Sequence, residues 1–304
     1  MKRISLLAVA VIFAFASCNK ELDSISEVKC ESISVSTVVG KPLTRDVITG
    51  TVFPTGRSIA ISADLNADTG GSGNYFSGLG FSYDDGAWVP ASIYYWPLSG
   101  SLEMLAYSAG SASVTPSWTN ATSVALSCAD CSADDILVGG LTAATSLNRT
   151  ITFSHALAQV KATVSCSAAS AVKVKSITIN AKKGAVLTAS KGAGSSATSV
   201  STVLSGSLVD NTLFSGNQTV TTGAVAAGGA MLLPAQTPGS MTINYTITNN
   251  GVESGVMSVT KSLSQAIAAG SSYTYAIAFT LTGITVTASL SDWTPQSSTP
   301  VSMP

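Results

Sequence analysis

The sequence predicts an all-β protein made of two antiparallel β-sandwich domains. Apolar and polar residues alternate along many short segments, as expected for strands with one buried face. Clusters rich in Gly, Asn and Ser separate these segments, and no window after the first 17 residues repeats with the period of a helix. The length of 304 residues fits two domains at about 150 residues each.

The first residues have the pattern of an export signal. Met1-Lys2-Arg3 is basic and Ile4 to Phe15 is apolar apart from Ser5, which is typical of a signal peptide and too short for a membrane-spanning helix. The residues before Cys18 resemble a bacterial lipobox, so we expect residues 1–17 to be a lipoprotein signal peptide and Cys18 to carry the lipid. An ordinary cleavage site with an unmodified Cys18 is the alternative. The polar residues 18–31 are then a tether to the outer membrane, on the cell surface.

Alternation places the expected strands along the rest of the chain. In chain order they are Ser58–Ala63, Ser92–Trp96, Ser101–Tyr107, Val160–Cys166, Ser176–Asn180, Met241–Ile247, Tyr273–Leu281 and Ile284–Leu290. Residues 182–223 are rich in Gly, Ser and Ala, and we expect them to form long loops.

A polar stretch at Thr142 to Thr150 separates an aromatic-rich first half from an aliphatic second half. We place a domain boundary there, with an N-terminal domain at 32–147 and a C-terminal domain at 148–304. Each domain is long enough to bury a core of its own.

Charge and motif content exclude several function classes. Lys and Arg number 15 against 16 Asp and Glu, which leaves no basic excess to hold nucleic acid. The single histidine, His155, rules out a multi-histidine metal centre, and no hydrolase or nucleotide-binding motif is present. We therefore expect no enzyme activity, no metal and no cofactor. Cys128 and Cys131 are expected to form a local disulfide or to stay as two thiols.

Aromatic residues in the first half raise a second possibility. Trp88, Tyr94, Tyr95, Trp96 and Trp118 could stack on sugars if they were exposed, although packing in a core is the commoner use of such residues. A glycan-binding surface lipoprotein is thus the alternative function.

A series of motifs in a defined order resembles the fimbrillin family, the subunits of type V pili in Gram-negative anaerobes. After the lipobox these motifs are Leu43-Thr44-Arg45, Trp88-Val89-Pro90, Ile93–Pro97, Leu102–Tyr107, Asp135-Ile136-Leu137, Ile151–Leu157, Leu232–Gln236, Gly270–Tyr275 and Ser291-Asp292-Trp293. Each motif is weak alone, but together they cover nearly the whole mature chain.

The resemblance implies transthyretin-like domains and assembly by strand exchange. A trypsin-like protease would cut after an arginine near the N-terminus, for which Arg45 is the first candidate and Arg57 the second. The segment Ser32 to Val39 would be the strand removed. Its side chains Ile33, Val35 and Val38 are the expected plug of an apolar groove.

A strand of a neighbouring fimbrillin subunit would then fill that groove. The expected donor is the C-terminal region, either the tail beyond Trp293 or the strand carrying Ile284, Val286, Ala288 and Leu290. The prolines of the tail lack the N–H that a central ladder requires, which favours the strand.

Overall fold

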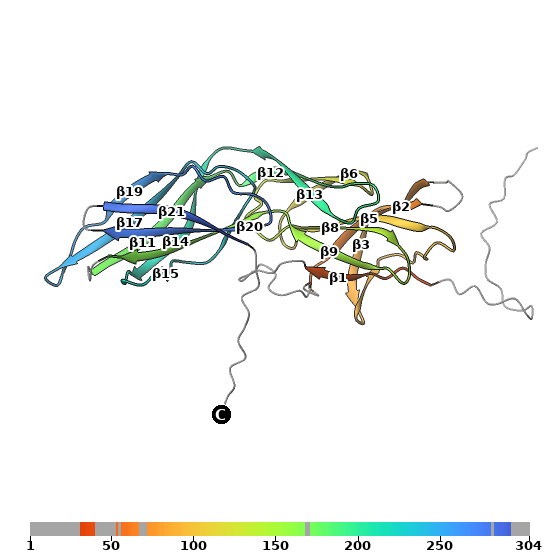
Figure 1. The fold of residues 1–304 in the computed structure, drawn as a ribbon, viewed down its shortest axis with the longest axis horizontal. Coiled ribbons are helices and arrows are strands. Elements are labelled where there is room, and N and C mark those ends of the chain that lie inside the picture. Colours follow the sequence, from red (N-terminus) through yellow and green to blue (C-terminus); the bar gives the residue numbers. More distant parts are fainter. Residues whose placement is uncertain are drawn as a thin grey trace, which may run out of the picture. The chain divides into compact units, whose positions relative to one another are not determined.

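The structure, a computed structural model, describes residues 31–39, 53, 56–66, 72–167, 171–280 and 283–292. Within these ranges every regular element is a β-strand, as Figure 1 shows. None of the described residues belongs to a helix that is long and apolar enough to cross a bilayer. The expected all-β class is confirmed.

The N-terminal part of the described chain is organised around a seven-stranded sheet. In spatial order its strands are β1 (Ser36–Val39), β9 (Thr150–His155), β8 (Leu137–Ala144), β5 (Ser101–Ser108), β2 (Ile59–Asn66), β3 (Ser72–Asp84) and β4 (Ala87–Pro90). β1 and β4 are therefore the two ends of the sheet.

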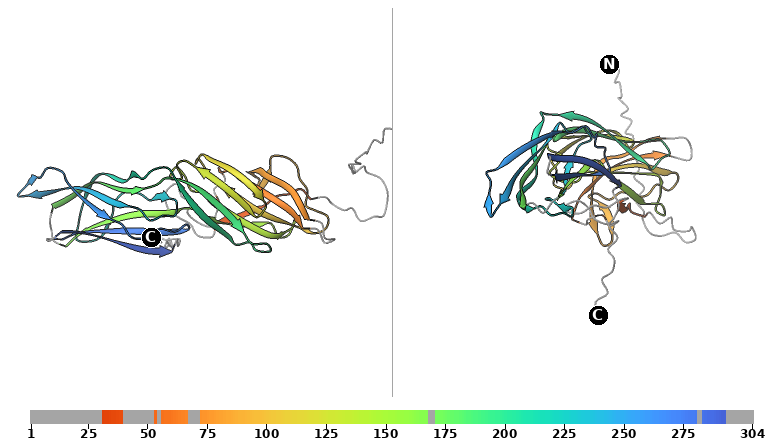
Figure 2. Two further views of the ribbon diagram at one scale, coloured as in Figure 1. Left: turned by 90° about the horizontal axis from the view of Figure 1, so that it is seen from above. Right: turned by 60° about the vertical axis from the view of Figure 1, so that its left-hand side comes forward.

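A four-stranded sheet contributes to the same region. Its order is β13 (Thr198–Ser205), β12 (Gly184–Lys191), β7 (Ser123–Cys128) and β6 (Val114–Asn120). Strands β12 and β13 lie beside strands of the N-terminal half, as the teal and yellow strands of Figure 2 show.

Two five-stranded sheets complete the chain. The first has β15 (Val225–Ala226), β10 (Ala158–Cys166), β20 (Ser271–Thr280) and β21 (Gly283–Asp292) in order, with β16 (Met231–Leu233) also paired to β10. The second has β14 (Val209–Thr219), β11 (Ala171–Ala181), β17 (Ser240–Asn249) and β18 (Val252–Glu253) in order, with β19 (Met257–Ser262) also paired to β17.

Three apolar cores lie within these sheets. One lies on the inner face of the seven-stranded sheet and includes Met104 and Leu141, while a second lies between its other face and the four-stranded sheet and includes Leu105 and Val138. β5 and β8 are thus buried on both faces, which explains their nearly continuous apolar sequence. The third core is shared by the two five-stranded sheets. A transthyretin-like sandwich stays a prediction.

The sheets are not purely antiparallel. β1 runs parallel to β9, and β10 runs parallel to β20, whereas the other strand pairs in the described chain are antiparallel. Residue alternation is the same in both kinds of pairing, so the sequence pattern alone does not distinguish them.

Strands on the two sides of the expected boundary at residue 147 pair with each other in the same sheets. β9 follows that residue but pairs with β8, and the hairpin β12–β13 pairs with β7. The strands on both sides belong to one compact unit that starts at Glu31. The division into domains at 147 stays a prediction about the chain, whereas these pairings are observed.

Two local expectations were wrong. Residues 182–223 are not long loops, because β12, β13 and β14 all lie in this range. Along β12 buried positions alternate with partly buried ones, and along β13 partly buried positions alternate with exposed ones. Residues 92–96 form no regular strand, only a single bridge from Tyr95 to Ser32. Prolines 90 and 97 flank that segment and lack the N–H that a longer ladder needs.

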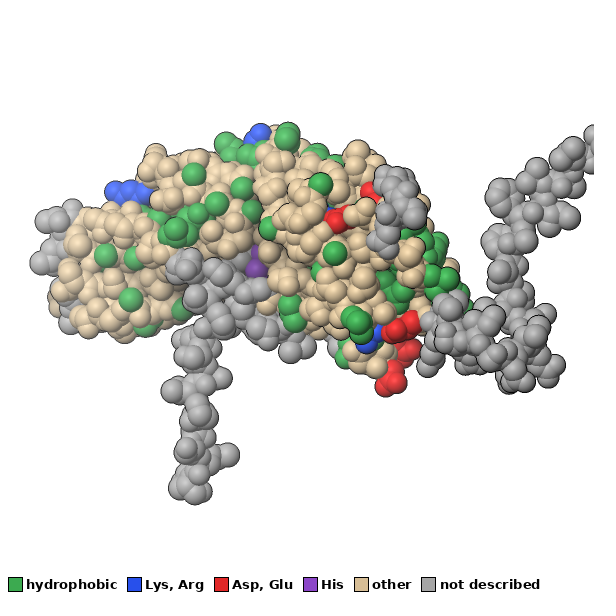
Figure 3. Space-filling view, turned by 45° about the vertical axis from the view of Figure 1, so that its right-hand side comes forward, with side chains coloured by type: hydrophobic (Ala, Val, Ile, Leu, Met, Phe, Trp, Pro, Cys, Tyr) green, Lys and Arg blue, Asp and Glu red, His purple; other side chains and the backbone are tan. Residues whose placement is uncertain are grey.

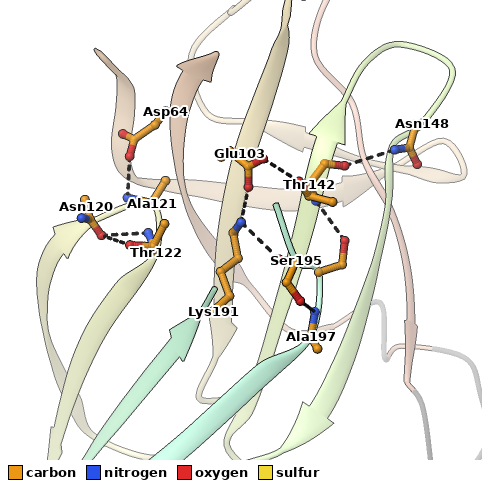
Figure 4. A network of polar contacts seen from close by, with 11 residues as sticks. Asp64, Glu103, Asn120, Ala121, Thr122, Thr142, Asn148, Lys191, Ser195 and Ala197 are labelled. Carbon is orange, nitrogen blue, oxygen red and sulfur yellow. Dashed lines mark hydrogen bonds and ion pairs between the residues drawn. The ribbon is translucent and has the colours of Figure 1, made fainter. Parts of the chain in front are cut away.

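A partly buried ion pair ties the hairpin β12–β13 to the seven-stranded sheet (Figure 4). Lys191, at the end of β12, donates through Nζ to Glu103 Oε2 on β5, and its side chain is 0 % exposed. Thr142 on β8 donates through Oγ1 to the other carboxylate oxygen of Glu103, at 2.5 Å. Both charges of the pair are thus compensated, as burial requires.

We expect the acid sensitivity of the β17–β18 region to depend on Glu253. This carboxylate contacts Lys175 Nζ at 2.8 Å and Lys173 Nζ at 3.4 Å, and accepts a hydrogen bond from Thr246 Oγ1 at 2.7 Å. These contacts, first of all the one with Lys175, lower the pKa of Glu253 from 4.5 to about 2. A lowered pKa in the folded state stabilises the fold above pH 4.5, and this contribution disappears as the pH falls toward 2.

Glu253→Gln removes this contribution, so its unfolding midpoint should fall less steeply than that of the wild type between pH 5 and pH 2. Thermal unfolding of both proteins at several pH values over that interval measures the difference. Parallel curves would contradict the assignment.

Candidate functional site

Residues 31–39, here called the closing segment, include β1 and pair with both β9 and β4 of the seven-stranded sheet. On the β4 side, Ile33 N–H donates to Tyr94 O at 2.8 Å. Val35 N–H donates to Trp88 O, and Trp88 N–H donates back to Val35 O, both at 2.9 Å. This half of the segment is antiparallel to β4.

The other half of the closing segment pairs with β9. Ser36 N–H donates to Arg149 O at 2.9 Å, and β1 then runs parallel to β9 from Ser36 opposite Thr150 to Val39 opposite Phe153. The closing segment therefore forms backbone hydrogen bonds with β9 and with β4. Figure 1 shows β1 beside β9.

Alternate side chains of the closing segment enter the core. Ile33, Val35 and Val39 are all buried in the same apolar cluster as Trp88 and Phe153. The period of two is the one that a strand requires when one of its faces is covered. The segment is thus an integral part of the core and not a surface strand.

Val38 does not fill the core as expected. Its side chain is 37 % exposed, while Val39 is buried. Alternation from Ile33 and Val35 places Thr37 and Val39 on the inner face and Val38 on the outer one. Continuing the period of two from Val35 through Thr37 identifies Val39 as an inward residue from the sequence.

On the outer face, Arg149 holds the start of the closing segment. Its Nη1 donates to Ser34 Oγ at 2.9 Å and lies 3.3 Å from Glu31 Oε1. Because the Arg149 and Glu31 side chains are both exposed, this contact contributes little to stability compared with the buried face.

The side chain of Arg57 is held by contacts within the protein. Its guanidinium pairs with Asp134, and Nη1 donates to Asp135 O at 2.8 Å. Its side chain is only 10 % exposed. A trypsin-like protease binds an arginine side chain in its own pocket, so this arrangement disfavours Arg57 as the cleavage site.

The expected donor strand lies at the edge of its sheet. β21 pairs along its length with β20 and has no strand on its other side in the described chain. Ile284 and Val286 are half-buried against the core, whereas Ala288 and Leu290 are exposed. Cys18, Arg45 and the tail from Trp293 lie outside the described residues.

Groups with possible chemistry are buried in the described chain. His155 Nδ1 lies 2.7 Å from Asp135 Oδ2, and both side chains are buried. Cys128 and Cys131 are buried thiols, and burial together with Cys128 raises the pKa of Cys131. Among the described residues no cluster of three metal-ligating side chains occurs.

Trp88, Trp96 and Trp118, the tryptophans that the structure describes, do not form an exposed platform for sugars. Trp88 is 2 % exposed and packs edge-on against Phe53, and Trp96 is also buried. Tyr95 is exposed and Trp118 is half-buried. The aromatic cluster of the first half thus serves mainly as core, including the part that contacts the closing segment.

A sequence profile of the fimbrillin-like family matches residues 44–293. The chain belongs to the fimbrillin-like family. The match spans most of the chain, as the ordered series of motifs implied. No curated protein matches this fimbrillin-like chain in sequence.

Solved structures share the fold of this fimbrillin-like protein. A candidate cell adhesion protein from Bacteroides uniformis matches with a TM-score of 0.53 and 15% identity, over 86% of this chain and 99% of its own. A fimbrial protein from Bacteroides vulgatus matches with a TM-score of 0.53 and 14% identity, over the same shares of the two chains. At these identities the similarity is one of fold.

Proposed function

We propose that this chain is a structural subunit or accessory component of a cell-surface pilus that serves adhesion. It is exported as a lipoprotein anchored through Cys18 to the outer membrane. A trypsin-like protease cuts after Arg45, the closing segment leaves, and a strand of a neighbouring fimbrillin subunit replaces it.

The two-sided pairing of the closing segment carries this proposal. Removing it would leave unpaired backbone groups on both β4 and β9, together with the apolar positions of Ile33, Val35 and Val39. An unpaired sheet edge beside an open apolar groove is a template for another strand. Backbone pairing supplies affinity and the alternate pockets supply specificity.

The contacts of Arg57 and the position of Arg45 in the sequence support Arg45 as the cleavage site. Arg57 is paired with Asp134 and precedes β2, a central strand of the sheet. A cut there would require breaking a partly buried ion pair. Arg45 follows the closing segment in the chain, so a cut after it separates that segment from the remaining strands of the sheet.

β21 is suited to leave its own sheet because, among the described residues, only β20 pairs with it. Its inward-facing positions Ile284 and Val286 are only half-buried, and Leu290 is exposed. Detaching it therefore disrupts less packing than detaching a central strand would. We propose that it, or the tail that follows, is the donor.

The surface fits a protein polymer better than a charged ligand. Figure 3 shows a face with few Lys, Arg, Asp and Glu side chains and with hydrophobic side chains scattered over it. The net charge of −1 agrees with protein partners and not with nucleic acid. The family and the fold-level relatives, one fimbrial and one assigned to adhesion, support the same function.

Limited trypsin digestion of the lipid-free chain starting at Asn19 tests the proposal. We expect a cut after Arg45, found by mass spectrometry, followed by strand-exchanged filaments in electron microscopy. Arg45→Ala should lose both the cut and the filaments. Arg57→Ala is the matched control and should still be cut after Arg45.

Clean removal of the segment from a protein that stays monomeric would contradict polymerisation. Filaments from uncut Arg45→Ala would contradict the requirement for cleavage.

A further inference from the structure

A side-chain hydrogen bond to a buried indole distinguishes one position of the closing segment, Thr37, whose own side chain is partly buried. Trp88 Nε1–H donates to Thr37 Oγ1 at 2.8 Å. Trp88 is 2 % exposed, so water has little access to this indole. Ile33, Val35 and Val39 fill the other inward positions with apolar side chains. Thr37 is thus the one polar side chain at the inward positions from 33 to 39.

β21 repeats the pattern of the closing segment. Residues 33–39 read Ile-Ser-Val-Ser-Thr-Val-Val, and residues 284–290 read Ile-Thr-Val-Thr-Ala-Ser-Leu. With Ile284 placed at the position of Ile33, the inward residues correspond pair by pair. The third pair differs in polarity, because Ala288 stands where the closing segment has Thr37.

We infer that Trp88 is a specificity-determining residue of the groove, which favours an incoming strand with a hydroxyl at its third inward position. The inference rests on the proposed strand exchange and adds to it the chemistry of the preferred strand. In this register the segment 284–290 of a second copy fits the apolar positions but leaves Trp88 Nε1–H without an acceptor. The groove therefore retains its own closing segment more tightly than β21 of a second copy.

The physical reason is the asymmetry of hydrogen bonding in a buried site. A strand that lacks the hydroxyl forfeits the hydrogen bond and leaves a desolvated donor behind. From the typical cost of one such donor we expect a loss of about tenfold in affinity. Thr and Val have nearly the same shape, so this substitution tests the hydrogen bond with little change in packing.

A peptide-displacement experiment tests the inference on the full mature chain. A site for a sequence-specific protease is placed within residues 40–50, and the chain is cut there so that the closing segment stays bound without a covalent link. Synthetic peptides then displace it, and its release is followed by a fluorescent label. The first pair of peptides covers residues 31–39, with Thr37 or with Thr37→Val. The second pair covers residues 283–291, with Ala288 or with Ala288→Thr.

We expect Thr37→Val to weaken binding about tenfold and Ala288→Thr to strengthen it about tenfold. A Thr37→Ser peptide keeps the hydroxyl and should bind far better than Thr37→Val. In a Trp88→Phe protein the two peptides of each pair should bind with about equal affinity, because the indole N–H donor is absent. If that variant does not fold, the indole N–H signal of Trp88 in the wild type gives the same information, since it should differ between the complexes with the native and the Thr37→Val peptides.

Equal binding of the native and the Thr37→Val peptides to the wild type would overturn the inference and leave strand exchange intact. Differences that persist in a folded Trp88→Phe protein would also overturn it. Failure of every peptide to displace the closing segment would instead overturn the proposed strand exchange, and the inference with it.

Discussion

Val35→Asp should destabilise the folded chain by about 4 kcal/mol or more, because it removes buried apolar area and puts a charge in the core. Val35 is completely buried in the cluster that contains Trp88. Its backbone also exchanges two hydrogen bonds with Trp88. The substitution should therefore undock the closing segment before it unfolds the rest of the sheet.

Val38→Asp is the matched control. It introduces the same charge three residues along the same segment, on a side chain that is 37 % exposed. We expect its unfolding free energy to stay within about 0.5 kcal/mol of the wild type. Chemical unfolding of both variants, with trypsin digestion to report undocking, measures the contrast. Equal destabilisation by the two variants would show that the inward register of the segment is misassigned.

Lys191→Ala should lower the free energy of unfolding by about 2–3 kcal/mol, which is less than for a fully buried ion pair because the Glu103 side chain is 17 % exposed. The Lys191 ammonium contacts Glu103 and is 0 % exposed, and Glu103 would keep its charge without its main partner. Since the pair connects β12 to β5, the loss should loosen the hairpin β12–β13 from the seven-stranded sheet. Hydrogen exchange of β12 amides reports that loosening, and chemical unfolding reports the free energy.

Lys183→Ala serves as the control for this prediction. Lys183 pairs with Asp130 at 3.4 Å, but both side chains are exposed, so the expected cost is below about 1 kcal/mol. Replacing the partly buried pair by Lys191→Met with Glu103→Leu should recover most of the stability, because no charge is then left unpaired. A Lys191→Ala protein as stable as Lys183→Ala would contradict the partly buried character of the pair.

The central strands of the sheets could be predicted from the sequence. The alternation from Val160 to Cys166 falls within β10, and that from Tyr273 onward matches β20 closely. Large apolar residues at every second position leave one strand face that must be buried, so local pattern and tertiary packing agree there. Ile33 and Val35 were expected as an apolar plug because of the resemblance to the fimbrillin family, and both are buried in the core.

The hairpin β12–β13 could not be predicted in the same way. Its residues are mostly small or hydroxylated, such as Ala189, Ser190 and Ser199, and this composition is also typical of loops. What makes them strands is pairing with β7 and the burial of Leu187 and Ala189 between two sheets. Both depend on residues about 60 positions earlier in the chain.

The sequence by itself determined the all-β class and the near-neutral net charge. Only the tertiary structure decided that the closing segment joins β4 to β9, and that Trp88 meets Thr37 across 51 residues of chain. Periodicity is a local property that specifies which face of a strand is buried. Strand order and register instead arise from hydrogen bonds between distant segments, which no single segment encodes.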